Sequence, residues 1–166
     1  MTRWLDDDEQ EAWRAYLWST QLIFDHLERQ MQREGGIPHT YYVIMAMLSE
    51  APDRSLTMTQ LARLTRGSAS RLSHAVGKLE RNGWVRRVKH PDDARTNIAT
   101  LTDEGSATVE AHAPGHVAAV REALFDQLTP EQVDQLKTIS QAVLDKLEPR
   151  LTPPGGTAAG SPPGPA

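Results

Sequence analysis

The chain has 166 residues, of which 39% are hydrophobic and 24% charged, with a formal net charge of −4 at pH 7. This length suits one domain with a real core, and the lack of cysteine excludes disulfides, thiolate zinc sites and cysteine nucleophiles. The acidic start MTRWLDDDEQEAW is unlike a signal peptide, and no apolar run approaches the roughly 20 residues of a membrane span. We therefore expect a cytoplasmic protein without a membrane partner.

Two helices are predicted in the first third of the chain. From about residue 8 to 34, positions spaced by three or four form one apolar stripe, with a polar gap at Thr20: Trp13, Leu17, Phe24, Leu27 and Met31. Gly35-Gly36 ends this helix, and Pro38 opens a second one, HTYYVIMAMLSE, which stops before Ala51-Pro52.

Residues 57–83 predict a helix-turn-helix. Thr57-Met58-Thr59-Gln60 matches a capping box, so a helix begins there and ends near Gly67. The next helix, which Gly83 ends, has apolar positions at i, i+4 and i+7 that share a buried face: Leu72, Val76 and Leu79. Its basic positions share another face: Arg71, His74, Lys78 and Arg81. Two short helices with a tight turn and a basic outer face are typical of this motif.

A hairpin follows. Trp84 to His90 is expected to form one strand and Thr96 to Leu101 the other, with turn chemistry supplied by Pro91-Asp92-Asp93-Ala94. A two-stranded ribbon beside a recognition helix can reach the adjacent minor groove of DNA, where arginine is favoured.

The last third of the chain predicts two more helices. Thr102 caps the first, which we expect to be interrupted by a kink or a break at Pro114-Gly115. Thr129-Pro130-Glu131-Gln132 starts the second. Its apolar stripe, with a polar gap at Ser140, is close to a heptad seam: Val133, Leu136, Val143 and Leu147. From Pro149 the chain is rich in proline and glycine, so residues 149–166 are expected to be disordered.

Positive charge is concentrated in one segment. Residues 54–95 hold ten Lys and Arg against three Asp and Glu, a local balance of +7, and the remainder of the chain carries −11. A segregated basic face is the electrostatic footprint of a polyanion-binding surface, because phosphate contacts release condensed counterions. A solvated charged face is the alternative that charge alone leaves open.

These motifs together resemble the multiple-antibiotic-resistance regulator (MarR) family. The resemblance rests on Asp93-Ala94-Arg95 followed, after five intervening residues, by Leu101-Thr102, and preceded by Leu72-Ser73, Val76, Leu79-Glu80 and Gly83-Trp84-Val85. It covers roughly Asp8 to Glu148. It implies a mainly α fold with a small β wing: a winged helix-turn-helix at about 38–102, flanked by dimerisation helices at about 8–34 and 103–148, forming a single MarR-type domain over 1–148.

The resemblance also implies a function. A homodimer would bind a pseudo-palindromic DNA operator through two winged helices, with repression favoured over activation as its mode. By position, Arg95 is the minor-groove arginine of the wing tip and Asp93 the carboxylate that steadies it. Many members carry two arginines at the tip, whereas this chain has Ala94-Arg95-Thr96. This difference implies weaker binding of the wing to the minor groove. The DNA-binding residues are expected on the recognition helix and the wing: Ser68, Ser70, Arg71, Ser73, His74, Lys78, Arg86, Arg87, Lys89, Asp93 and Arg95.

The same resemblance suggests a small aromatic or phenolic effector that releases DNA. Ring stacking and a tyrosine hydroxyl suit such a ligand, and the candidate residues lie in the first two helices: Trp13, Tyr16, Tyr41 and Tyr42. Plain core packing of these rings is the alternative.

Other functions are less well supported. Glu110, His112 and His116 could ligate a metal, with His26 or His39 added, but solvated or dimer-surface histidines are favoured, and we expect no metal and no cofactor. No nucleophile elbow, phosphate loop, dinucleotide fingerprint or zinc-protease motif occurs, so an enzyme is not expected. A winged helix used only for protein contact is the remaining alternative, although such a surface would present apolar anchors rather than cations.

Overall fold

The computed structural model describes residues 1–91 and 93–148, and Ala94 by its backbone alone. The chain divides into two compact units. One comprises residues 1–39 and 112–133, and the other comprises residues 40–111 and the chain from residue 134 onward. The predicted disordered segment 149–166 lies outside the described residues. Within the described chain, no helix is both long enough and apolar enough to cross a membrane.

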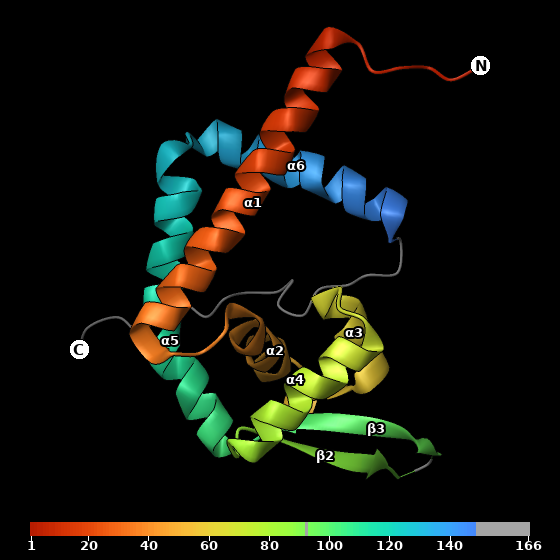
Figure 1. Ribbon diagram of the computed structural model, residues 1–166, viewed down its shortest axis with the longest axis vertical. Helices are drawn as coiled ribbons and strands as arrows, with labels where there is room; N and C mark the ends of the chain where they lie inside the picture. The colour runs from red at the N-terminus through yellow and green to blue at the C-terminus, as the bar shows by residue number, and fades with distance from the viewer. Residues whose placement is uncertain (92, 149–166) are drawn as a thin grey trace. The chain divides into compact units, whose positions relative to one another are not determined.

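The first unit is built on α1 (Asp7–Gly35), the longest helix in Figure 1, together with the C-terminal part of α5 (Asp103–Ala123). Asp6 caps α1 in a reciprocal capping box with Glu9, and Gly36 ends it in the left-handed conformation at φ 61°. A short 3-10 turn, η2 (Phe125–Gln127), follows α5. The predicted end of the first helix at Gly35-Gly36 is confirmed.

Helix α5 runs without interruption from Asp103 to Ala123, with Pro114 inside it. The expected break at Pro114-Gly115 is therefore wrong, because the helix continues through both residues. Tertiary packing explains why: a Cβ on Gly115 would overlap the Glu34 carboxylate and lie 3.0 Å from Gln30 Nε2, so the bare glycine lets α5 pack closely on α1. His112 and His116 thus lie on one turn of a regular helix after all.

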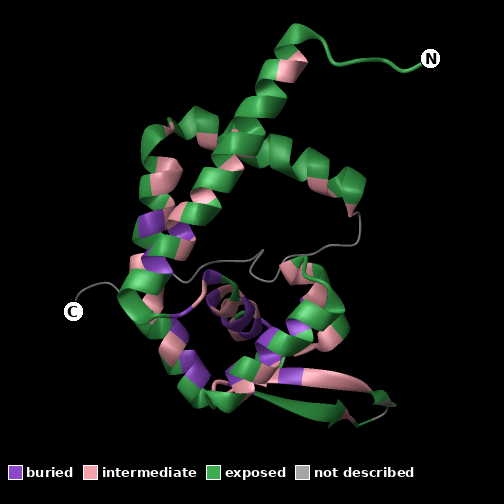
Figure 2. Ribbon diagram, viewed as in Figure 1, coloured by how far each residue is buried: buried purple, intermediate pink, exposed green. Residues whose placement is uncertain are grey.

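The second unit contains the winged helix. Its helices are α2 (His39–Ser49), which starts in the first unit, α3 (Met58–Thr65) and α4 (Ala69–Arg81). Figure 2 shows buried positions in both α2 and α4. The core comes from these three helices and from the sheet of the same unit: Ile44, Met45, Leu48, Leu61, Val76, Leu79 and Ala99. Burial of each large side chain stabilises the fold by about 1.5–3 kcal/mol.

A three-stranded antiparallel sheet completes this unit, in the order β1-β3-β2. Its strands are β1 (Ser55–Thr57), β2 (Val85–His90) and β3 (Asp93–Leu101). The sequence did not predict β1, because three residues are too short to show a period-two pattern. The second hairpin strand begins at Asp93 rather than Thr96. The remaining helix, α6 (Pro130–Leu147), is capped by Thr129 and Gln132 as predicted.

Two histidine rings stack inside the first unit. The centroids of His39 and His116 are 5.3 Å apart, and the Glu28 carboxylate accepts the backbone N–H of His39 at 2.9 Å. Burial lowers the pKa of His39, partly offset by the charge of Glu28. Burial, and then the charge of His39, lower the pKa of His116. Within the described part of the chain, no group of three or more His, Asp or Glu side chains could hold a metal ion.

Acidification is expected to destabilise the protein through this pair. Because the folded pKa values lie below the ordinary value of about 6.5, the unfolded chain binds extra protons as the pH falls below 6.5. The contribution of the neutral pair is therefore complete above that pH and is lost as the pH falls toward the folded pKa values. The decrease in melting temperature from pH 7 to pH 5 should be larger in the wild type than in His116→Gln. An equal difference in His116→Gln would contradict the assignment.

Candidate nucleic-acid interface

The recognition helix α4 is set in place by caps on both helices of the motif. Thr57 and Gln60 form the predicted capping box of α3: Gln60 N–H donates to Thr57 Oγ1 at 3.2 Å, and Thr57 N–H donates to Gln60 Oε1 at 2.9 Å. Ser68 is the N-cap of α4, and its hydroxyl accepts the N–H of Arg71 at 3.2 Å. Ser68 therefore has a structural role in addition to its predicted contact with DNA.

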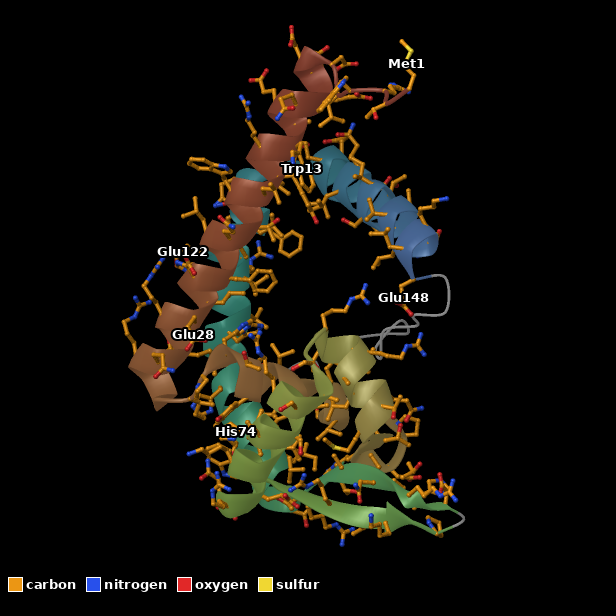
Figure 3. The ribbon with its side chains drawn as sticks, turned by 45° about the vertical axis from the view of Figure 1, so that its right-hand side comes forward. Met1, Trp13, Glu28, His74, Glu122 and Glu148 are labelled. Atoms are coloured by element: carbon orange, nitrogen blue, oxygen red, sulfur yellow. The ribbon has the colours of Figure 1, made fainter. Side chains whose placement is uncertain are left out.

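One face of α4 is buried and another is open to solvent. Leu72, Ala75, Val76 and Leu79 are buried. The side chains predicted to read DNA from this helix are all exposed: Ser70, Arg71, Ser73, His74 and Lys78. The position of His74 on α4 can be followed in Figure 3. Arg71, His74 and Lys78 follow one another at spacings of three and four, so they form a single row along the helix.

The wing carries cations on both faces of its outer strand. β2 pairs with β3 from Val85 opposite Leu101 to Lys89 opposite Asn97, with an irregularity before His90. Since side chains alternate along a strand, Arg86 lies on one face, and Arg87 and Lys89 lie on the other. All three are exposed.

The wing tip is held by Asp93. One carboxylate oxygen accepts the backbone N–H of Arg95 at 3.0 Å, and the other accepts the hydroxyl of Thr96 at 2.7 Å. These two hydrogen bonds, that of Thr96 first, lower the pKa of Asp93, so it is ionised at neutral pH. Asp93 thus orders the backbone that presents the exposed Arg95, and no ion pair joins the Arg95 guanidinium to a described residue.

The ten cations of the basic segment fall into two groups. Four form ion pairs with acidic side chains: Arg54 with Asp103 at 3.0 Å, Arg63 and Arg66 with Glu148 at 2.8 and 3.2 Å, and Arg87 with Glu80. The other six have no ion-pair partner among residues 1–91 and 93–148: Arg71, Lys78, Arg81, Arg86, Lys89 and Arg95. All six lie on α4 or the wing, where their charge remains available to an anionic partner.

Three comparisons with known proteins identify the chain. The MarR family model matches residues 35–96. Sco3205, a MarR family transcriptional regulator from Streptomyces coelicolor solved in complex with DNA, is 49% identical, with a TM-score of 0.84 over 93% of this chain and 97% of that one. The chain belongs to the MarR family. The predicted family, fold class and transcription-regulator class are confirmed, and so is the prediction that the chain is not an enzyme, because the relatives are regulators.

Two further relatives support this placement among MarR regulators. AbsC, a MarR family transcriptional regulator from Streptomyces coelicolor, is 37% identical with a TM-score of 0.82, covering 90% of this chain and 100% of that one. The transcriptional repressor YetL of Bacillus subtilis is 27% identical over 112 residues, which span 68% of this chain and 66% of YetL.

The predicted effector residues lie in separate parts of the chain. Trp13 and Tyr16 belong to the first unit, where they are 49% and 59% exposed with ring centroids 6.3 Å apart. Tyr41 and Tyr42 belong to the second, and the pKa of the buried Tyr42 is raised by burial and by Glu50. The effector pocket therefore stays a prediction.

Two features of the structure were not anticipated. One is an apolar groove of about 530 Å³ in the first unit, whose lining includes Leu22, Ile23, Leu124 and Leu128. The other is the pairing of Glu80 with Arg87. No local sequence signal marks either, since each joins residues whose proximity depends on how separate elements pack.

Proposed function

We propose that this protein is a sequence-specific DNA-binding transcriptional regulator that binds a pseudo-palindromic operator as a homodimer. The observation that carries the proposal is the set of six cations without ion-pair partners in the described chain, all on α4 and the wing. The row of Arg71, His74 and Lys78 suits base edges and phosphates in the major groove, and Arg95 at the wing tip suits the minor groove. Sco3205, a relative of 49% identity, was solved in complex with DNA.

The homodimer is supported by apolar surface that a monomer would leave in water. On α1, Trp13, Trp18, Leu22 and Phe24 are 49 to 69% exposed, and on α6, Ile139, Val143 and Leu147 are 48 to 70% exposed. Monomeric soluble proteins rarely expose large apolar patches, and the three side chains of α6 recur every four residues, so they form one apolar row along that helix. A second copy of the chain would cover them and would place two winged helices on one duplex.

Repression, and release by an aromatic effector, are the finer parts of the proposal. YetL, at 27% identity, is described as a repressor. The aromatic side chains of α1 and α2 that we assign to the effector are Trp13, Tyr16, Tyr41 and Tyr42. An effector that releases DNA must bind the operator-bound dimer less tightly than the free dimer, by the same factor by which it weakens operator binding. Equal affinity for phenolic acids in both states would reject this mechanism.

The DNA-binding proposal is tested by selection from a pool of duplexes with a randomised centre. We expect the selected duplexes to share an inverted repeat whose half-sites are about one helical turn apart. Arg95→Ala should weaken binding to a selected duplex by on the order of 1–3 kcal/mol, most where an A·T-rich segment flanks the half-site. Arg71→Ala should relax discrimination at one or two base pairs in each half-site.

Two further variants control this experiment. Asp93→Ala removes a negative charge, yet it should weaken binding because the wing tip loses its order. Arg33→Ala removes a cation from α1 and should change little. If no duplex is enriched over the random pool, the winged helix serves protein contact and the DNA-binding proposal is wrong.

A further inference from the structure

Arg87 lies between the wing and the recognition helix. Its Nε donates to Glu80 Oε2 at 2.7 Å, its backbone N–H donates to Glu80 Oε1 at 3.0 Å, and its Nη1 donates to Ser73 Oγ at 3.3 Å. The side chains of Arg87 and Glu80 are 32% and 28% exposed, so both are partly withdrawn from water. Arg87 therefore satisfies several of its donors inside the protein.

The face of α4 beneath Arg87 is shaped to receive it. Ser73, Gly77 and Glu80 follow one another at spacings of four and three, so they form one row along the helix. A Cβ on Gly77 would lie 3.9 Å from Arg87 Nη2, which places the guanidinium directly over this glycine. This row is separate from that of Arg71, His74 and Lys78, whose side chains stay exposed.

The contact also provides a hydrogen-bond acceptor for the outer edge of β2, which pairs with no other described strand. β2 is the outer strand of the sheet and pairs only with β3 among the described strands. Its other edge presents unpaired N–H groups, and Glu80 accepts one of them, that of Arg87. Because this carboxylate also binds the guanidinium, one side chain of α4 holds both the backbone and the side chain of β2.

We propose that Arg87 and Glu80 form a clamp that fixes the wing relative to the recognition helix, so that Arg87 acts as a positioning residue rather than as a phosphate contact. This inference rests on the proposed DNA binding. A wing and a helix held at a fixed angle can engage two grooves without first losing conformational freedom, which improves affinity. The guanidinium charge is neutralised by Glu80, so it adds little to the attraction of phosphates.

The salt dependence of DNA binding separates the two roles. The logarithm of the binding constant falls linearly with the logarithm of the salt concentration, and the loss of one phosphate contact makes this slope less steep by about 0.9. We expect this decrease for Arg86→Ala, which removes an exposed cation from the opposite face of β2. Arg87→Ala and Glu80→Gln should each weaken binding to a selected duplex about tenfold, as expected for a lost charge-assisted hydrogen bond, with the slope unchanged.

Two further variants sharpen the test. Arg87→Lys keeps the charge but cannot form the forked contact, so it should weaken binding as much as Arg87→Ala does. The double variant Glu80→Gln/Arg87→Ala should be no weaker than either single variant, because the two residues act as one unit. If Glu80→Gln binds as tightly as the wild type or tighter, or if Arg87→Ala lowers the slope as Arg86→Ala does, the clamp is rejected.

A measurement without DNA keeps this test distinct from that of the proposed function. In the free protein, hydrogen exchange at the Arg87 amide should be faster in Glu80→Ala, which removes both carboxylate oxygens, than in the wild type, while the amides of α2 remain protected. Unchanged exchange at Arg87 would overturn the clamp even if DNA binds. Faster exchange in a protein that enriches no duplex would support the contact while rejecting DNA binding, and with it the positioning role.

Discussion

The double substitution Ile139→Glu/Val143→Glu is expected to convert the proposed homodimer to monomers and to reduce operator affinity by at least about 100-fold. Ile139 and Val143 are 63% and 48% exposed on one face of α6. Burial of such a side chain is worth about 1.5–3 kcal/mol, and two-fold symmetry counts each substitution twice. The double substitution should therefore reduce the free energy of dimerisation by several kcal/mol, and each 1.4 kcal/mol is a tenfold change in the dissociation constant. A monomer would also engage only one half-site.

Sedimentation at micromolar concentration and binding to a selected duplex measure the two effects. The matched control is Thr138→Glu/Gln141→Glu, which adds the same charge to the same helix at exposed positions on the side away from the apolar stripe. We expect the control to remain a dimer. A dimeric Ile139→Glu/Val143→Glu protein with unchanged affinity would show that α6 is not part of the interface.

The features of this fold that were predictable from sequence depend on interactions between residues that are close together in the chain. Thr57 with Gln60, and Thr129 with Gln132, satisfy backbone groups within three residues of themselves, so their patterns identify helix starts without knowledge of the rest of the chain. The buried row of Leu72, Val76 and Leu79 was equally evident, because a helical period repeats within a few turns.

The features that were missed depend on packing between distant segments. β1 exists because Ser55, Leu56 and Thr57 pair with β3, more than 40 residues later in the sequence. Pro114 lies inside α5 because tight packing at Gly115 supports the helix, whereas local chemistry alone favours an interruption.

Within the candidate site, the sequence predicted the cations but not their partners. It grouped Arg87 with Arg86 and Lys89 because all three precede the same turn. The carboxylate of Glu80, on a different element, distinguishes Arg87 from the other two. Charge patterning thus located the interface, and the packing of α4 against β2 decides which of its cations are available to DNA.

Gly105→Ala is expected to destabilise the protein by about 3 kcal/mol, although alanine is the better helix former by about 1 kcal/mol. Gly105 lies in the first turn of α5, where its N–H donates to Thr102 Oγ1 at 3.0 Å. A Cβ there would overlap the carbonyl oxygen of Trp84 and lie 2.7 Å from Leu101 Cδ1. The Trp84 carbonyl cannot move freely, since it accepts the N–H of Thr102 at 3.0 Å.

Denaturant unfolding of Gly105→Ala and Gly77→Ala compares the same change in two helices. A Cβ on Gly77 would meet only side-chain atoms, at 3.8 and 3.9 Å, so this variant should be neutral or more stable by up to about 1 kcal/mol. The two effects are opposite in sign because a Cβ on Gly105 would overlap a backbone carbonyl, whereas a Cβ on Gly77 would meet only side-chain atoms at ordinary contact distance. Trp84 immediately precedes β2, and Leu101 is the last residue of β3. An added Cβ at Gly105 would therefore strain the junction between α5 and the two strands of the wing. Gly105→Ala should therefore speed amide exchange in β2, and a variant as stable as the wild type would show that α5 can move away from the hairpin at little cost.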